Sequence, residues 1–128
     1  MKKYYLVLIG LLVLTIIVVI LRGNEDAWIK TNNGIWEKHG NPSETPASVL
    51  EQQEAISKAL ELYTQKKSEG INFSSQCLGT VGNYAVDIAH VPRISEDNLV
   101  INQCEAYTMF RVSHFIEMDK DGNILRIN

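Results

Sequence analysis

The stretch that decides the architecture lies at the start of the chain and reads YYLVLIGLLVLTIIVVIL (Tyr4–Leu21). It carries no charge, and a helix over it spans roughly 27 Å, close to the hydrocarbon thickness of a bilayer. Such a run is too long for an ordinary core helix of a soluble domain. The sequence therefore predicts a transmembrane anchor over residues 1–22 that contacts membrane lipid through residues 4–21.

A cleavable secretory signal is the alternative, because Lys2 and Lys3 before an apolar stretch also describe such a signal. Cleavage needs small residues just beyond the apolar core, whereas residues 21–24 read LRGN. No Cys follows directly, which removes the lipoprotein route. We therefore expect a retained, single-pass anchor with its N-terminus inside and the C-terminal domain on the extracytoplasmic side.

The chain beyond the anchor is acidic. Residues 22–128 hold ten Lys and Arg against fifteen Asp and Glu, a formal charge of −5. Because phosphate repels such a domain, we expect no nucleic-acid partner and no basic patch that adheres to anionic lipid. The residues after Pro46 suffice for one small domain with a marginal core.

A tryptophan-bearing hairpin is predicted after the anchor. Residues 26–39 read DAWIKTNNGIWEKH, in which two β-prone runs flank the turn-forming triplet NNG. A three-residue loop puts Trp36 opposite Lys30 and leaves Trp28 on the same face. The two indoles then either pack within the ribbon and at the lipid headgroups or form an aromatic binding pair.

A linker rich in turn formers, GNPSETP, follows at residues 40–46, so that residues 23–46 form a hairpin and linker. Its motif, WI at 28–29 followed by NGIWEKHGNPS at 33–43, resembles N-G-x-W-x-K-H-G-N-P-S-x-x-P. That pattern is found in uncharacterised small single-pass envelope proteins of uncultured ultrasmall bacteria. The resemblance covers about a fifth of the chain and implies no activity. The family has a Cys where this chain has Lys30, so the resemblance gives no support for a disulfide in this linker.

The best-supported helix of the domain begins at Pro46 and ends before Gly70. Thr45 caps it with Pro46 at the first helical position, or Ser48 caps it with Glu51 three residues on. Apolar residues recur at helical spacing along one stripe, and Gly70 supplies the stop. One apolar stripe implies one covered face, so the helix must lie on a sheet.

The remaining residues predict an antiparallel sheet. The expected strands are 71–78, 83–91, one long or two shorter strands within 98–118, and 123–127. The fold class is therefore α+β, in which one long amphipathic helix packs on a four- to five-stranded meander within a domain of residues 47–128.

Cys77 and Cys104 are the only cysteines, and an even count outside the cytoplasm favours a disulfide. Closing its loop stabilises a domain by about 3.5 kcal/mol on chain-entropy grounds. The meander conflicts with this bridge, because it puts the two residues on opposite flanks of strand 83–91, about 10 Å apart, whereas a disulfide needs Cα atoms within about 7 Å. Either the first strand is irregular or the thiols are free. We expect the bridge because of the compartment.

Catalytic and metal-binding patterns are weak. A thiol hydrolase would combine a Cys with Asp87 and either His90 or His114, but Asp87 projects from the opposite side of its strand to His90. Zinc binding by the cysteines and histidines fails on spacing, since structural zinc sites use close ligand pairs. Residues 119–123, DKDGN, lack the later carboxylates of a calcium loop and indicate a hairpin turn. We expect no catalytic residue, no metal and no cofactor.

The sequence thus predicts a membrane-anchored protein, not an enzyme, that displays a small binding or structural module for an unknown protein or small-molecule ligand. The alternative is a membrane-tethered thiol enzyme or redox protein that uses Cys77 or Cys104. A concave sheet face would either be filled by the helix or leave a cavity open to a small ligand. The candidate binding surface consists of Trp28, Trp36, Tyr84, His90 and Phe110.

Overall fold

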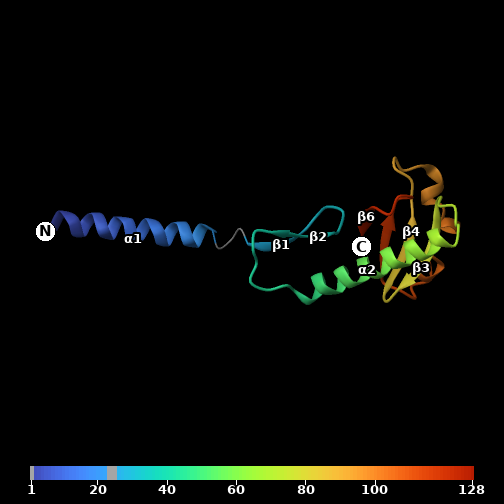
Figure 1. Ribbon diagram of the computed structural model, residues 1–128, viewed down its shortest axis with the longest axis horizontal. Helices are drawn as coiled ribbons and strands as arrows, with labels where there is room; N and C mark the ends of the chain where they lie inside the picture. Colours follow the sequence, from blue (N-terminus) through green and yellow to red (C-terminus); the bar gives the residue numbers. More distant parts are fainter. Residues whose placement is uncertain (1, 23–25) are drawn as a thin grey trace.

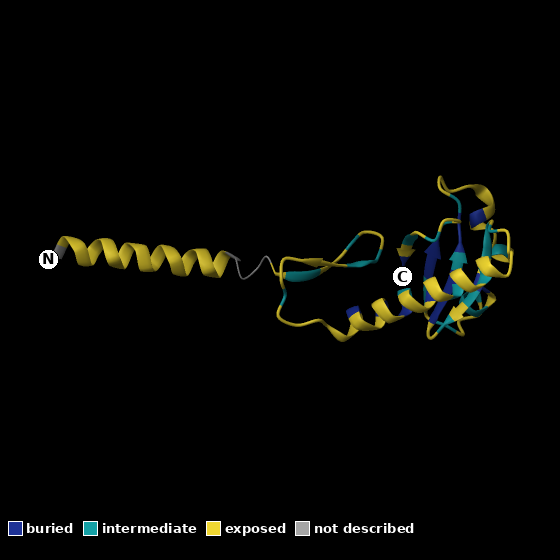
Figure 2. Ribbon diagram, viewed as in Figure 1, coloured by how far each residue is buried: buried dark blue, intermediate teal, exposed yellow. Residues whose placement is uncertain are grey.

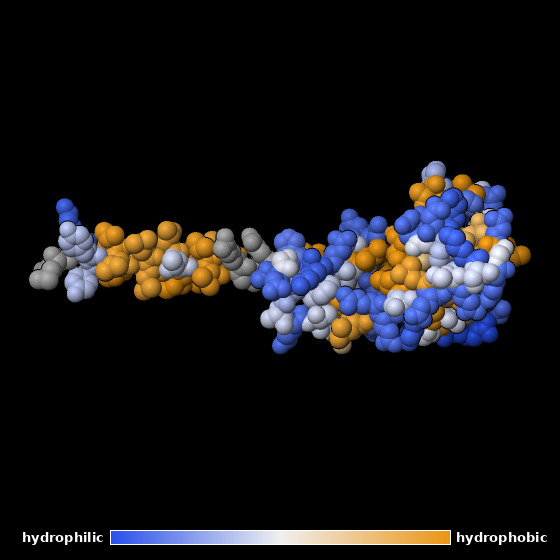
Figure 3. All heavy atoms as spheres, viewed as in Figure 1, coloured by the Kyte–Doolittle hydropathy of each residue, from blue (hydrophilic) through white to orange (hydrophobic). Residues whose placement is uncertain are grey.

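The computed structural model describes residues 2–22 and 26–128 (Figure 1). Helix α1 (Lys2–Arg22) extends away from the folded part of the chain. Its stretch Lys3–Leu21 is not buried anywhere along its length, and the face seen in Figure 3 is almost wholly apolar. α1 is long and apolar enough to span a membrane, although a signal sequence has the same properties.

The predicted tryptophan hairpin is confirmed. Strands β1 (Ala27–Lys30) and β2 (Trp36–His39) pair antiparallel, with Lys30 opposite Trp36. Gly34 turns the chain in the loop with a positive φ of 78°, a conformation that glycine adopts without steric cost. The Nζ of Lys30 lies 5.9 Å from the ring centroid of Trp36, so a cation covers that indole.

The tip of the hairpin folds against the domain. Gln52, only 4% exposed, donates from Nε2 to the Gly34 carbonyl and accepts the Trp36 N–H at Oε1, both at 2.9 Å. The Ile127 N–H donates to the Asn33 carbonyl at 2.8 Å. The linker therefore separates hairpin and domain along the sequence, while three hydrogen bonds join them in space.

The predicted long helix is confirmed as α2 (Ala47–Ser68). Its start differs in detail: Pro46 occupies the N-cap position, and neither predicted side-chain cap forms among residues 45–51. Every third or fourth residue turns inward, which gives α2 one buried face and one exposed face (Figure 2). The buried hydrophobic residues of that face are Val49, Ala55, Ala59 and Tyr63.

A four-stranded sheet lies under α2, in the order β3-β4-β5-β6. Its strands are β3 (Gln76–Val81), β4 (Tyr84–Ile88), β5 (His114–Met118) and β6 (Ile124–Ile127). The predicted α+β class is confirmed. The predicted meander is wrong at one connection, because β4 and β5 are parallel, whereas β3 with β4 and β5 with β6 are antiparallel.

The parallel pair is joined by residues 89–113, here called the crossover. Residues expected to form strands within 98–118 instead form short helical turns, and strand structure begins only at His114. A parallel pair cannot be joined by a tight turn and needs a dozen or more connecting residues, which the crossover supplies. Its elements are η1 (Ser95–Asn98), η2 (Val100–Asn102) and α3 (Glu105–Thr108).

The two faces of the sheet have different covers. On one face, buried apolar side chains pack against the inner face of α2 and form the core. Side chains of alternate residues point to the other face, where the crossover lies over them and buries Cys104 completely. The strand residues of the core are Leu78, Tyr84, Val86, Ile88, Ile116, Met118 and Ile127.

Candidate functional site

The predicted disulfide between Cys77 and Cys104 is present, with Cα atoms 4.7 Å apart. The conflict with the predicted register disappears for two reasons. Cys104 is not on a strand but directly precedes α3 in the crossover, over the sheet face. In addition, β3 is irregular, since its register with β4 shifts between Cys77 and Gly79.

Four polar or sulfur-bearing residues form a single row across the sheet, here called the cross-strand row. Cys77 pairs with Asp87, Asp87 with Glu117, and Glu117 with Arg126, so each of the four strands contributes one member. Directly paired residues point to the same face of a sheet. This row lies on the face away from α2, under the crossover.

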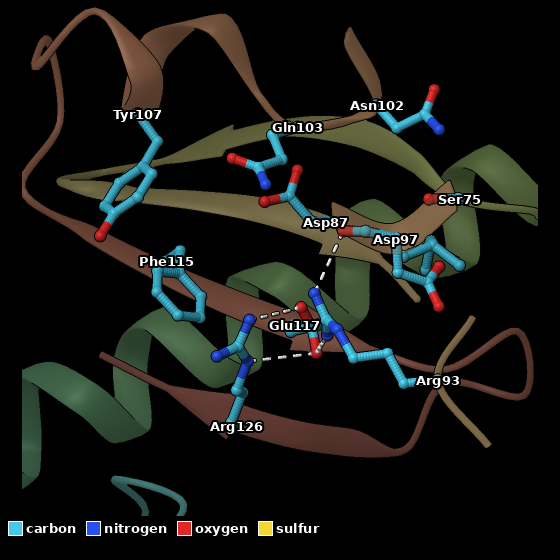
Figure 4. A pocket seen from close by; sticks show the side chains of 11 residues that line it. Ser75, Asp87, Arg93, Asp97, Asn102, Gln103, Tyr107, Phe115, Glu117 and Arg126 are labelled. Carbon is cyan, nitrogen blue, oxygen red and sulfur yellow. Dashed lines mark hydrogen bonds and ion pairs between the residues drawn. The ribbon is translucent and has the colours of Figure 1, made fainter. Parts of the chain in front are cut away.

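A pocket of about 170 Å³ lies over this row (Figure 4). Asp87, Glu117 and Arg126 line it from the sheet, together with Phe115. Figure 4 shows Tyr107 and Phe115 along one side and Glu117 between two guanidinium groups. The crossover contributes Arg93, Asp97, Asn102, Gln103 and Tyr107 to the lining.

Glu117, 7% exposed, lies between two arginines. Its Oε1 accepts from Nη1 of Arg93 at 2.5 Å and from Nε of Arg126 at 3.2 Å, and its Oε2 accepts from Nη2 of Arg126 at 3.1 Å. The Arg126 guanidinium also lies 4.9 Å from the Phe115 ring centroid. Both arginines are therefore already paired with a carboxylate, which weakens the attraction of the pocket for a further anion.

Asp87 has an unusual environment for a carboxyl group. Burial raises the pKa of Asp87 to about 6; the Cys104 N–H and Arg126 lower it, and Glu117 raises it. The Oδ1 of Asp87 accepts the Cys104 N–H at 2.9 Å, whereas its Oδ2 receives no hydrogen bond from the described part of the chain. Asp87 therefore titrates near neutral pH and offers one free oxygen.

Asp97, on the crossover side of the pocket, is ionised. Burial of Asp97 opposes ionisation, but hydrogen bonds from Ile94, His90 and Ser75 lower its pKa to about 2. The His90 ring Nδ1 lies 2.9 Å from Oδ1 of Asp97, and the Ile94 N–H donates to Oδ2 at 2.9 Å. This carboxylate orders the start of the crossover.

The structure does not bring the predicted binding residues of the domain together. Tyr84 is 7% exposed and lies in the core beside α2, stacked on His114 at 4.9 Å. His90 is held by Asp97 beyond the other end of β4. Phe110 is 93% exposed after α3, with a positive φ of 56°. α2 covers the sheet face that includes Tyr84, and none of the pockets of the described residues is lined by Tyr84, His90 and Phe110 together.

The predicted aromatic pair lies on the hairpin rather than at the pocket. Trp36 lies under Lys30, and its backbone N–H is bound to Gln52. The indole N–H of Trp28 is buried without a hydrogen-bond partner in the described part of the chain. Trp28 and Trp36 are both half-buried.

The sequence indicates Asp87 only as a possible partner of a catalytic Cys, and the other pocket residues are not identified because each is unremarkable by itself. Asp87 and Glu117 both alternate with apolar residues on their strands, which was the available signal that they face away from the core. Their proximity depends on the parallel pairing of β4 with β5. The sulfur atoms of Cys77 and Cys104 and an Asp87 oxygen lie within 4.8 Å of one another, but sulfurs joined in a disulfide offer no thiolate to a metal.

Comparisons with protein-family models, with curated proteins and with solved structures gave no match for this chain. The chemistry of the pocket and the placement of α1 therefore carry the functional argument. The α+β domain has a sheet with an apolar face under α2 and a polar face under the crossover, where some side-chain polar atoms have no hydrogen-bond partner among the described residues.

Proposed function

We propose that α1 anchors this protein in a membrane and that the domain is a binding module displayed on the extracytoplasmic side, where its pocket binds a small, neutral polar ligand. The observation that carries the proposal is the pocket over the cross-strand row. It presents the free Oδ2 of Asp87 and the Gln103 amide, whose side chain makes no hydrogen bond to described residues, beside the Phe115 ring.

The membrane placement is supported by length and composition. The stretch Lys3–Leu21 of α1 is apolar and fully exposed, which is costly in water and favourable in lipid. Lys2 and Lys3 at its start favour an N-terminus inside. The Cys77–Cys104 disulfide fits an oxidising compartment for the domain.

The size and chemistry of the pocket limit the ligand. Its volume of about 170 Å³ is below the roughly 300 Å³ at which drug-sized pockets begin, so a single ring or a smaller molecule fits. An anion would compete with Glu117 for both arginines. A hydroxyl group, in contrast, both donates and accepts, so it suits the Asp87 carboxyl and the Gln103 amide. A single sugar ring, with an apolar face for Phe115, meets these requirements best.

The anchor is tested by expressing the full-length chain and extracting membranes with alkaline carbonate. We expect the protein to stay in the lipid fraction with its N-terminal residues intact, as shown by mass spectrometry. Release into the aqueous fraction, or loss of residues 1–22, would contradict the membrane placement.

The ligand is tested with full-length protein in phosphatidylcholine nanodiscs. Calorimetric titration with neutral monosaccharides, including glucose and N-acetylglucosamine, and with acetate and inorganic phosphate is expected to give saturable binding only for a neutral sugar. Gln103→Ala should weaken binding about fivefold, since one hydrogen bond is worth about 1 kcal/mol.

Gln53→Ala is the matched control, because Gln53 is exposed on α2. This variant should bind as the wild type does. Equal binding by Gln103→Ala and wild type would contradict binding in this pocket. Tighter binding of phosphate than of any sugar would contradict the proposed ligand class.

A further inference from the structure

We propose that the Cys77–Cys104 disulfide undergoes thiol–disulfide exchange with an external dithiol, which attacks Cys77 while the Asp87 carboxyl protonates the departing Cys104 sulfur. This activity goes beyond ligand binding and does not depend on it. The proposal stands on the placement of three residues beside the pocket: an exposed cysteine, a buried cysteine and a half-buried acid.

The two cysteine residues differ in exposure. Cys77 is exposed on β3, whereas Cys104 is 0% exposed beneath the crossover. Attack on a disulfide requires an approach to one sulfur, and the other sulfur leaves. An external thiolate therefore reaches Cys77, and Cys104 is the leaving group.

Asp87 is fixed beside the leaving sulfur. Its Oδ1 accepts the backbone N–H of Cys104 at 2.9 Å, and a carboxyl oxygen lies within 4.8 Å of both sulfurs, a gap across which one water relays the proton. Burial, which raises the pKa of Asp87 to about 6, leaves part of the carboxyl protonated at neutral pH. A proton donor with a pKa near the ambient pH is suited to general acid catalysis.

The exchange balances in two steps. A thiolate of the dithiol bonds to Cys77 Sγ; the Cys77–Cys104 bond breaks, and Cys104 Sγ leaves with the electron pair and takes the Asp87 proton. The second thiol of the dithiol then loses its proton to water. The resulting thiolate attacks the dithiol sulfur that is bonded to Cys77, and Cys77 leaves as a thiolate. Water protonates the Cys77 thiolate. The protein gains two electrons and two protons, the dithiol becomes a disulfide, and Asp87 regains a proton from water.

The alternative is a purely structural disulfide, which is common in small extracytoplasmic domains. Two observations favour exchange. One of the two cysteines, Cys77, is an exposed residue at the surface of β3. Moreover, a purely structural bridge does not require a half-buried carboxyl group near the sulfurs, where partial burial disfavours its ionised form.

The test uses full-length protein in phosphatidylcholine nanodiscs with dithiothreitol as the dithiol. Reduction is followed without denaturant by quenching with an alkylating agent and mass spectrometry. We expect the folded wild type to be reduced, and Asp87→Asn to be reduced at least tenfold more slowly at pH 7. Asparagine can still accept the Cys104 N–H but is not an acid, so the backbone contact is retained.

Glu105→Gln is the matched control, because it removes one negative charge next to Cys104 from an exposed side chain. Its rate should stay within twofold of the wild type. A second measurement does not depend on any variant: brief treatment of the wild type with glutathione should give the mixed disulfide on Cys77 and not on Cys104.

Three results would overturn the proposal. The first is a wild-type disulfide that is reduced only after denaturation. The second is an adduct on Cys104, and the third is an Asp87→Asn rate equal to that of the wild type. Gln53→Ala changes an exposed residue of α2 on the other side of the sheet, so it should exchange at the wild-type rate whether or not the pocket binds a sugar.

Discussion

The two faces of the sheet are built by the same four strands, yet one face packs into the core and the other lines a polar pocket. Toward α2, Val86, Ile116 and Met118 are completely buried and fill the space. Toward the crossover, Asp87 and Glu117, their neighbours in sequence, line a pocket and interact through hydrogen bonds and ion pairs. Because successive side chains of a strand point to opposite faces, neighbouring residues contribute either to the stability of the core or to the chemistry of the pocket.

The largest expected effect is on the apolar face. Ile116→Ala removes a fully buried side chain and leaves a cavity in the core, so we expect a loss of about 4 kcal/mol in the free energy of unfolding. Urea denaturation of the full-length protein in nanodiscs measures it. Ile101→Ala is the control, because Ile101 is 88% exposed and its loss should change stability by less than about 0.5 kcal/mol. Equal effects of the two changes would contradict the assignment of the core.

A smaller loss is expected on the polar face from Glu117→Gln. The change keeps the side-chain shape but leaves Arg93 and Arg126 facing each other without their shared carboxylate. Because both arginines are partly exposed, we expect about 2–3 kcal/mol, less than for a fully buried network. The loss should grow at low salt, where repulsion between the arginines is less screened. A salt-independent loss would indicate a packing defect instead.

Asp87 gives the polar face a pH dependence. Its folded pKa, about 6, lies above the model-compound value of 3.8, so the folded state holds more protons between these values and stability falls as pH rises through this window. Relative to Asp87→Asn, wild type should lose on the order of 2 kcal/mol between pH 4 and pH 7. Asp97 does not interfere, because its pKa is lowered to about 2 and its contribution is lost only as pH falls below 4. A stability difference between the two proteins that does not change with pH would contradict the raised pKa of Asp87.

The smallest effect on stability is expected at Gln103, although its effect on binding is substantial. Its side chain makes no hydrogen bond to the described residues, so Gln103→Ala should change the free energy of unfolding by less than about 0.5 kcal/mol. Sugar affinity should nevertheless fall about fivefold. Urea denaturation measures the free energy of unfolding, and calorimetry on the same sample measures the sugar affinity. A large loss of stability would place Gln103 with the core instead.

The features that were predictable from the sequence are those set by local chemistry. The Asn-Asn-Gly loop fixed the pairing of Lys30 with Trp36, and the apolar stripe of α2 identified its buried face. The disulfide followed from the cysteine count and the expected compartment, although the register disagreed with it.

The features that could not be predicted depend on pairing between distant strands. The crossover contains no periodic pattern that marks a parallel return, so a meander was the simplest arrangement of its β-prone residues. Without the parallel pair, Asp87 and Glu117 do not adjoin, and neither the cross-strand row nor the pocket exists. Tyr84 and Phe110 fall in apolar rows of the predicted strands, but the strand expected at Phe110 does not form, so Phe110 is exposed while Tyr84 lies in the core.

The most direct test of the division between the two faces is a map of backbone amide shifts during titration of the full-length protein in nanodiscs with N-acetylglucosamine. The account predicts saturable shifts centred on Asp87, Gln103 and Phe115, around the pocket beneath the crossover. Shifts centred instead on Glu51, Lys58 and Tyr84, which line a second cavity beside α2, would contradict it.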